Sequence, residues 1–172
     1  INDVGAYTRT NIPDSYRLGL ELQGKSTLTH WLNLTGTLTV SQNRVQKFTE
    51  FYDDYDNGGQ KSNTYGNTTI AYSPSIIGSA SINITPLRNL EMSFPGKYVS
   101  RQYLDNTSNK ARRLDAFYVQ DIRMAYIISK VFFKEINLVA QVNNAFNKKY
   151  EPNGYTFSYL YGGSVITENY YF

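Results

Sequence analysis

The sequence predicts an all-β chain that forms an antiparallel up-and-down transmembrane β-barrel, and three observations support this prediction. Apolar and polar residues alternate with a period of two along most of its 172 residues. Several alternating segments exceed the about 5–6 residues of a typical soluble strand and match the about 9–11 residues that cross a membrane. The connections alternate between short and long, which is typical of outer-membrane barrels.

The composition agrees with this fold class and excludes several functions. The chain has 16 Tyr, 9 Phe and 1 Trp, and aromatic residues favour strands. Its 17 Lys and Arg against 14 Asp and Glu give no support for nucleic-acid binding. Without cysteine there is no disulfide, thiolate nucleophile or Cys-ligated zinc, and a single His, His30, excludes multi-His metal sites. No apolar run is long enough for a transmembrane helix.

The first three expected strands show the alternation most clearly. Residues 17–23 place leucines at every second position, and residues 32–41 alternate leucine and valine with Asn, Thr and Ser. Residues 69–85 alternate over roughly 17 positions, which is longer than a membrane-spanning strand requires. Pro74 lies inside this segment and cannot donate a ladder hydrogen bond, so a bend or bulge is expected there.

Three further strands follow in the same pattern. Residues 90–99 alternate around Pro95, where a second bend or bulge is expected. Residues 118–128 alternate less regularly, and residues 136–143 return to a clear alternation. A seventh strand is expected to begin at residues 170–172.

The two faces of these strands differ in polarity. The in-strand charges all lie on the polar side, where they would line a wet lumen: Arg17, Glu21, Glu91, Lys97, Asp121 and Arg123. Leu34, Ile76, Ile82 and Leu138 represent the side that would face hydrocarbon. Tyrosines near the segment ends predict an aromatic girdle at the lipid–water boundaries: Tyr16, Tyr72, Tyr98 and Tyr126.

The connections predict which loops share a rim. Short connections are expected at residues 24–30, 86–89 and 129–135, and long ones at residues 43–67, 103–115 and 147–169. The short turns would then lie at one rim of the barrel and the long loops at the other. Because every backbone polar group in a membrane needs a partner, an open set of seven strands is expected to belong to a larger barrel.

Several segments resemble TonB-dependent outer-membrane receptors. Residues 142–150 read Val-Asn-Asn-Ala-Phe-Asn-Lys-Lys-Tyr, which is similar to a segment close to the C-terminus of these receptors. Residues 151–155 and 167–172 resemble the stretch that leads into their last strand. Residues 12–17, 97–99 and 102–106 resemble earlier parts of the same barrel, and all the matches occur in the right order.

The resemblance implies that residues 1–172 are the C-terminal portion of an about 22-stranded barrel. The plug, the early strands and the end of the last strand would be absent. It also implies a receptor in the outer membrane of a Gram-negative bacterium that binds a scarce siderophore, haem, cobalamin, glycan or peptide. TonB would supply the energy for import through the missing plug. No cofactor, nucleic acid or catalytic residue is expected; outer-membrane lipid, lipopolysaccharide and a surface lipoprotein are the further partners.

Two groups of residues are candidates for ligand contact. Aromatic side chains on a glycine-bearing polar loop suit stacking on a ring-shaped ligand: Tyr155, Phe157, Tyr159 and Tyr161. The alternative is that these rings pack among neighbouring loops. Arg112 and Arg113 could bind lipopolysaccharide phosphates or an anionic ligand, or could simply be solvated.

A third group could bind calcium. Asp53, Asp54 and Asp56 place carboxylates on a loop that contains glycine, as calcium sites require. The loop lacks the full twelve-residue calcium-binding pattern, and a solvated acidic loop is the alternative.

Two other classes of protein remain open at this point. An outer-membrane enzyme would need an activated Ser or a carboxylate pair at the outer rim, whereas His30 is expected in a short turn on the opposite side. A soluble or surface-exposed carbohydrate-binding or adhesive β-domain would use the Tyr-rich loops as its binding surface.

Overall fold

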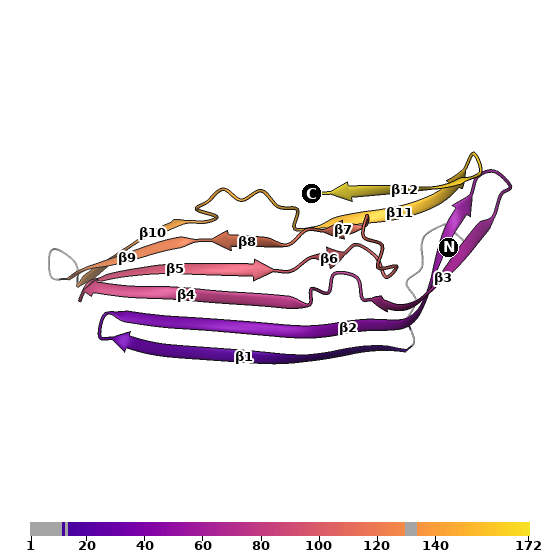
Figure 1. Ribbon diagram of the computed structural model, residues 1–172. Coiled ribbons are helices and arrows are strands. Elements are labelled where there is room, and N and C mark those ends of the chain that lie inside the picture. Colours follow the sequence, from indigo (N-terminus) through magenta and orange to yellow (C-terminus); the bar gives the residue numbers. More distant parts are fainter. Residues whose placement is uncertain (1–11, 13, 130–133) are drawn as a thin grey trace.

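The structure is a computed structural model that describes residues 12, 14–129 and 134–172. Every regular element in these ranges is a strand (Figure 1): β1 (Ser15–Thr29), β2 (Leu32–Asp54), β3 (Gln60–Thr69), β4 (Ile76–Leu87), β5 (Leu90–Val99), β6 (Gln102–Tyr103), β7 (Arg113–Leu114), β8 (Phe117–Gln120), β9 (Ile122–Ser129), β10 (Glu135–Val142), β11 (Gly154–Tyr161) and β12 (Ser164–Tyr171). The described part of the chain contains no helix with the length and apolar character needed to cross a membrane.

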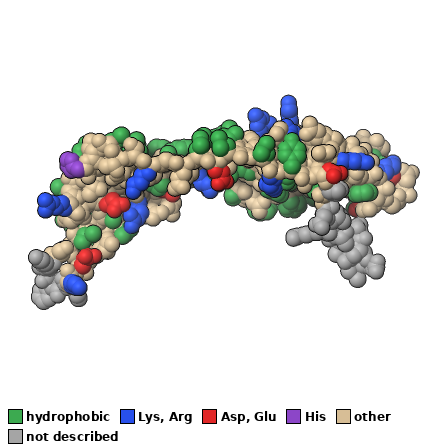
Figure 2. Space-filling model, turned by 90° about the horizontal axis from the view of Figure 1, so that it is seen from below, with side chains coloured by type: hydrophobic (Ala, Val, Ile, Leu, Met, Phe, Trp, Pro, Cys, Tyr) green, Lys and Arg blue, Asp and Glu red, His purple; other side chains and the backbone are tan. Residues whose placement is uncertain are grey.

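Ten strands form one curved sheet, which is a single layer. The order is β10-β9-β5-β4-β2, with β1 on the other side of β2, β3 paired with the later part of β2, and β8 beside β5. The β11–β12 hairpin joins the far end of β2 through a short parallel contact, and β6 and β7 form a separate two-stranded ladder. The space-filling view shows a thin arch rather than a two-layered sandwich (Figure 2). The all-β barrel-like class predicted from the alternation is confirmed.

Strand register places the apolar side chains in continuous rows across the sheet. Leu20 pairs with Val40, which pairs with Ile76, and a second row runs from Leu34 through Ile82. Farther along the sheet, Tyr126 pairs with both Leu90 and Leu138. Ile76, Ile82 and Leu138 are exposed and Leu34 is half-buried. None of the four packs into a dry centre.

The opposite face is polar, as the alternation predicts. Thr37 pairs with Ser79, which pairs with Lys97, and Arg123 pairs with Ser93. The in-strand charges therefore share one face of the sheet, opposite to the apolar rows, because successive side chains of a strand point to opposite faces.

The connections separate to the two ends of the sheet, as predicted (Figure 1). Two-residue turns at residues 30–31 and 88–89 join β1 to β2 and β4 to β5 at one end. The bounds expected for the first turn, residues 24–30, are wrong, because residues 24–29 belong to β1. The third short connection, residues 129–135, includes positions 130–133, which lie outside the described residues. The connections at the other end are longer and carry additional strands.

The third expected strand is wrong in extent. β3 ends at Thr69, β4 begins at Ile76, and the intervening residues form an irregular segment in which Tyr72 has a φ of 51°. Pro74 removes one ladder donor there, and the Tyr72 amide donates to the Tyr103 carbonyl at 2.9 Å. Alternation alone could not reveal this break, because apolar residues at every second position continue through it.

The bend or bulge expected at Pro95 is also wrong. β5 continues through Pro95, and its neighbour is divided into β8 and β9 at Asp121 without a change of register. The Asp121 amide donates to the Pro95 carbonyl at 2.9 Å, but Pro95 has no N–H to return the bond. The proline therefore removes one hydrogen bond and leaves the strand geometry intact.

The long connections contain more strand than expected. β2 and β3 extend so far that residues 55–59 alone form the tip between them. Residues 147–169 include most of the β11–β12 hairpin, so the final strand begins at Ser164 rather than at residue 170. These strands are rich in Asn, Thr, Ser and Tyr, and their composition resembles that of loops.

Candidate functional site

Three connections meet at the long-loop end of the sheet, and we call them together the outer loop cluster. They are the β2–β3 tip, the segment between β6 and β7, and the β11–β12 hairpin (Figure 1). The long strands β2 and β3 extend beyond the main sheet and carry the β2–β3 tip. The sequence-predicted ligand and metal residues lie in this cluster or in the adjoining strand ends, with Asp53 and Asp54 at the end of β2 and Arg113 at the start of β7.

The β2–β3 tip is fastened to the turn of the β11–β12 hairpin. Gly162 and Gly163 form this turn with φ of 62° and 74°, a conformation that favours glycine. Both glycine amides donate to the Asp56 carboxylate, at 2.8 and 2.7 Å. The Tyr55 amide donates to the Leu160 carbonyl at 3.0 Å. Two hairpins that are about a hundred residues apart in sequence are thus held together.

The predicted aromatic residues lie on one face of this hairpin. Tyr155 stacks on its cross-strand partner Tyr170, with ring centroids 4.9 Å apart and planes 10° apart. The ring of Phe157 also stacks with the rings of Tyr170 and Tyr159, with ring centroids 6.1 and 6.2 Å apart. The structure therefore brings these rings together. Tyr155, Phe157 and Tyr161 also remain exposed, so packing against each other does not remove them from solvent.

Arg112 is buried at the centre of the outer loop cluster, with 4% of its surface exposed. Its Nη1 lies 2.5 Å from Glu50 and 2.8 Å from Asp105. Its Nη2 donates to the hydroxyl oxygens of Ser158 and Thr167 at 2.7 and 3.0 Å. Burial alone would lower the pKa of Arg112, but its hydrogen bonds to the two carboxylates raise it. The guanidinium joins β2, β11, β12 and the β6–β7 segment.

Arg113 differs from its neighbour. It is half-buried, and its Nε lies 3.4 Å from the exposed Asp115 carboxylate. Of the two predicted arginines, Arg113 is therefore the one nearer to solvent.

Two tyrosines strengthen the same cluster. The Tyr65 hydroxyl donates to Glu50 at 2.9 Å, and burial together with this carboxylate raises the pKa of Tyr65. The Tyr72 hydroxyl donates to the Gly154 carbonyl. Tyr72 therefore belongs to the loops, while Tyr16, Tyr98 and Tyr126 are exposed on the sheet, where a girdle is predicted.

The three predicted calcium residues bind separate donors within the protein. Asp53 accepts from Gln60 at 2.9 Å, and Asp56 binds the glycine turn. Asp54 binds Lys61 at 3.0 Å and also accepts from Asn57. Burial opposes ionisation of Asp54, but these hydrogen bonds outweigh it and lower its pKa to about 2.

No group of three or more His, Asp or Glu within the described ranges is placed to hold a metal ion. The calcium role of Asp53, Asp54 and Asp56 stays a prediction. Their three carboxylates bind different donors and do not converge on one point where an ion could sit.

Two important members of the cluster were not predicted from the sequence. Glu50 and Asp105 meet only through Arg112, and they are distant from each other in sequence. Asp105 lies in the segment 102–106 that resembles the receptor family, but that resemblance does not relate it to Glu50, so their shared contact with Arg112 could not be inferred from local pattern.

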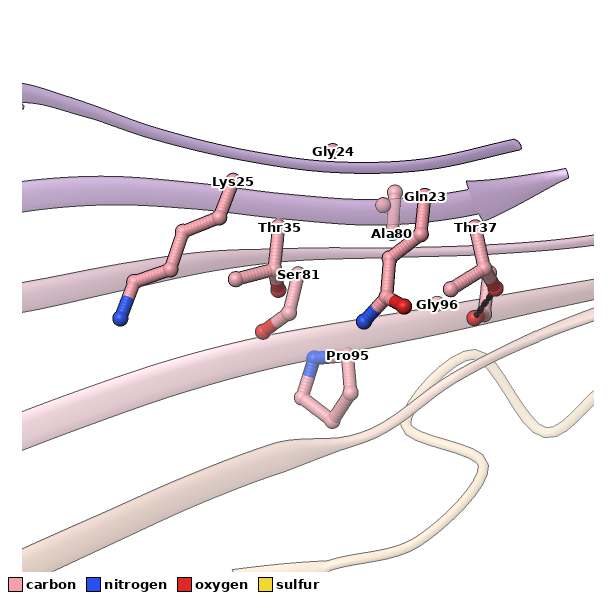
Figure 3. A pocket seen from close by; sticks show the side chains of 11 residues that line it. Gln23, Gly24, Lys25, Thr35, Thr37, Ala80, Ser81, Pro95 and Gly96 are labelled. Carbon is pink, nitrogen blue, oxygen red and sulfur yellow. Dashed lines mark hydrogen bonds between the residues drawn. The ribbon is translucent and has the colours of Figure 1, made fainter.

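A separate hollow lies on the polar face of the main sheet (Figure 3). Gln23, Lys25, Thr35 and Ser81 extend over it, and Thr37 hydrogen-bonds Ser79 at 2.7 Å beside it. The cavity measures about 280 Å³. The paired residues Gly24, Gly36, Ala80 and Gly96 also line it, whereas their small or absent side chains belong to the opposite, apolar face of the sheet.

Comparison with known proteins finds a likeness in structure. No family model and no curated protein matches the sequence. The crystal structure of the siderophore receptor PiuA from Acinetobacter baumannii matches 92% of this chain with a TM-score of 0.66 and 17% sequence identity. The chain has the fold of this receptor. It spans 22% of the receptor's length, and the likeness agrees with the sequence resemblance to part of a TonB-dependent receptor barrel.

Proposed function

We propose that this chain is the C-terminal portion of the barrel of an outer-membrane receptor in a Gram-negative bacterium. The observation that carries the proposal is the single-layered sheet, whose apolar rows cross the main strands while charged residues occupy the other face. A spanning barrel requires this arrangement, because one face meets lipid and the other meets water. The fold shared with a siderophore receptor supports the same proposal.

The work of such a receptor is capture followed by import, with energy supplied by TonB through a plug outside this chain. The solute would be a siderophore, haem, cobalamin, glycan or peptide. The stacked rings of Tyr155, Phe157 and Tyr159, together with Tyr161, offer ring surfaces for contact, and Arg113 offers a cation for an anionic group. Arg112 would act by positioning the loops. Lipopolysaccharide and a surface lipoprotein are further proposed partners.

Cell fractionation and uptake test this proposal. We expect the full-length protein in the outer-membrane fraction, extracted only by detergent. Deleting its gene should abolish uptake of one scarce solute, and deleting tonB should abolish the same uptake. Recovery of the folded protein in the soluble fraction without detergent would contradict the proposal and favour a soluble carbohydrate-binding domain.

A further inference from the structure

A second cavity lies within the outer loop cluster, where β2, β3, β11 and the β6–β7 segment meet. It measures about 220 Å³. Among the described residues, its lining carries three carboxylates and no Lys or Arg: Glu50, Asp53 and Asp105. The chain as a whole has a net charge of +3, so this local excess of acid is opposite in sign to the protein.

The protein's own cations neutralise the cavity only in part. Arg112 lies behind the lining and pairs with Glu50 and Asp105, so one guanidinium serves two carboxylates. Asp53 accepts from the neutral amide of Gln60 and has no ion pair among the described residues. The nearby Lys61 is bound to Asp54 at 3.0 Å. Within the part of the chain that the structure describes, two negative charges at the cavity therefore lack a counter-charge.

The remaining lining is largely aromatic and differs in exposure. Tyr52 is buried, Phe48 is half-buried, and Phe51 and Phe157 are exposed. Ring faces attract cations through their quadrupole when the charge lies within about 6 Å of the ring centre. Aromatic walls and carboxylates attract the same kind of group, a positively charged one.

The arrangement favours an organic cation over a metal ion. Calcium needs several oxygens within about 2.6 Å of one point. No group of three or more acidic residues or His in the described ranges is placed to do so. An ammonium group spreads its charge over a larger surface and can contact carboxylates and rings that are farther apart. The volume suits the end of a molecule rather than a complete drug-sized ligand, for which about 300–1,000 Å³ is usual.

We propose that this cavity binds an organic ammonium group, which is the positively charged end of the imported solute. The identification of the group as part of a solute rests on the proposed receptor function; the binding itself does not. Asp53 supplies the carboxylate that forms no ion pair with any described residue, and Phe157 supplies an exposed ring from the neighbouring hairpin. The proposal thus joins one residue of the predicted aromatic group to one of the predicted acidic group.

Calorimetric titration of the full-length protein in detergent micelles tests the proposal with two probes of equal shape. Choline carries a quaternary ammonium, and 3,3-dimethylbutan-1-ol replaces its nitrogen by carbon without charge. We expect choline to bind at least tenfold more tightly than the neutral alcohol. Asp53→Asn keeps the hydrogen bond from Gln60 and removes the charge, and should weaken choline binding at least fivefold. Phe157→Leu should weaken it as well.

Asp115→Asn is the matched control, because it removes an exposed carboxylate outside the cavity and should leave choline binding unchanged. Heat-modifiable gel mobility would verify that each variant is folded. Equal affinity for the two probes, absence of choline binding, or unchanged affinity in Asp53→Asn would overturn the inference. If TonB-dependent uptake persists while choline does not bind, this inference alone fails. If choline binds but the protein is not in the outer membrane, the proposed function fails instead.

Discussion

At the scale of single residues, Arg112 decides how the outer loops are held. Its guanidinium contacts two carboxylates and two hydroxyls from four parts of the chain. Glu50 and Asp105 retain only 13% and 20% side-chain exposure. Loss of the cation would leave two poorly hydrated carboxylates facing each other, which is far less favourable than loss of a surface pair.

We therefore expect Arg112→Met to lower the free energy of local opening of the outer loops by about 3 kcal/mol. Hydrogen exchange at the Leu104 amide, which donates to the Arg112 carbonyl at 2.9 Å, would measure it. Arg113→Met is the control: its partner Asp115 is 81% exposed, and the loss should stay below about 1 kcal/mol. Equal exchange rates in the two variants would contradict a central role for Arg112.

Asp54 gives a prediction about pH at the β2–β3 tip. Its pKa is lowered from 3.8 to about 2 because hydrogen bonds from Lys61 and Asn57 outweigh the effect of burial. A lowered pKa means that the ionised carboxylate stabilises the tip above about pH 4, and that this contribution is lost as the pH falls toward 2.

The Asn57 amide, which donates to Asp54 at 3.0 Å, should report this titration by NMR. We expect a midpoint near pH 2 in the wild type and no such transition in Asp54→Asn. A wild-type midpoint at the ordinary aspartate value would show that the hydrogen bonds do not stabilise the charge.

At the scale of elements, the β11–β12 hairpin depends on one close backbone approach. A Cβ at Gly154 would lie 2.5 Å from the backbone carbonyl oxygen of Tyr170, whereas a Cβ at Gly24 in β1 would meet no atom within 4 Å. Backbone cannot move aside as readily as a side chain can. The paired tyrosines Tyr155 and Tyr170 lie beside this contact.

Gly154→Ala should consequently destabilise the hairpin by about 1–3 kcal/mol, the usual effect of overpacking. Limited proteolysis within residues 154–171 would detect it, and Gly24→Ala should be cleaved at the wild-type rate. If the two alanine variants behave alike, the close approach at Gly154 has no energetic importance.

At the scale of the whole molecule, no second layer formed by residues 12, 14–129 and 134–172 covers the apolar face of the sheet. Leu18, Leu20, Leu22 and Val40 are exposed in rows that lipid would cover in the proposed barrel. The next position along β1, Gln23, points to the opposite face. A charge should therefore be destabilising at Leu22 and tolerated at Gln23.

Leu22→Lys should lower the free energy of unfolding in lipid vesicles by about 2–4 kcal/mol, as expected for Lys near the bilayer midplane. Gln23→Lys should change it little, because this residue borders the polar hollow beside Lys25. Urea titration of the refolded full-length protein would measure both. Equal effects would contradict the assignment of one face to lipid.

Much of the main sheet could be predicted from the sequence, because a strand with one apolar and one polar face must alternate. The alternation located β5, β10 and the segment that the structure divides into β8 and β9 opposite Pro95. The alternation of short and long connections predicted which connections share an end of the sheet. Alternation could not find the break before β4, where Pro74 lacks a ladder donor and the Tyr72 amide donates to the distant Tyr103 carbonyl. It also could not distinguish the polar β11–β12 hairpin from a loop.

By itself the sequence determined the class of fold and the polarity of each face, because both follow from side chains two positions apart. Only the tertiary structure decided what the outer loops contain. Arg112 was expected to be a candidate for an anionic ligand, and its burial between Glu50 and Asp105 depends on contacts across 62 and 7 positions of the chain. Asp53 meets Phe157 at one cavity because two hairpins converge there. Such proximity is a property of the folded chain, and no periodicity along the sequence encodes it.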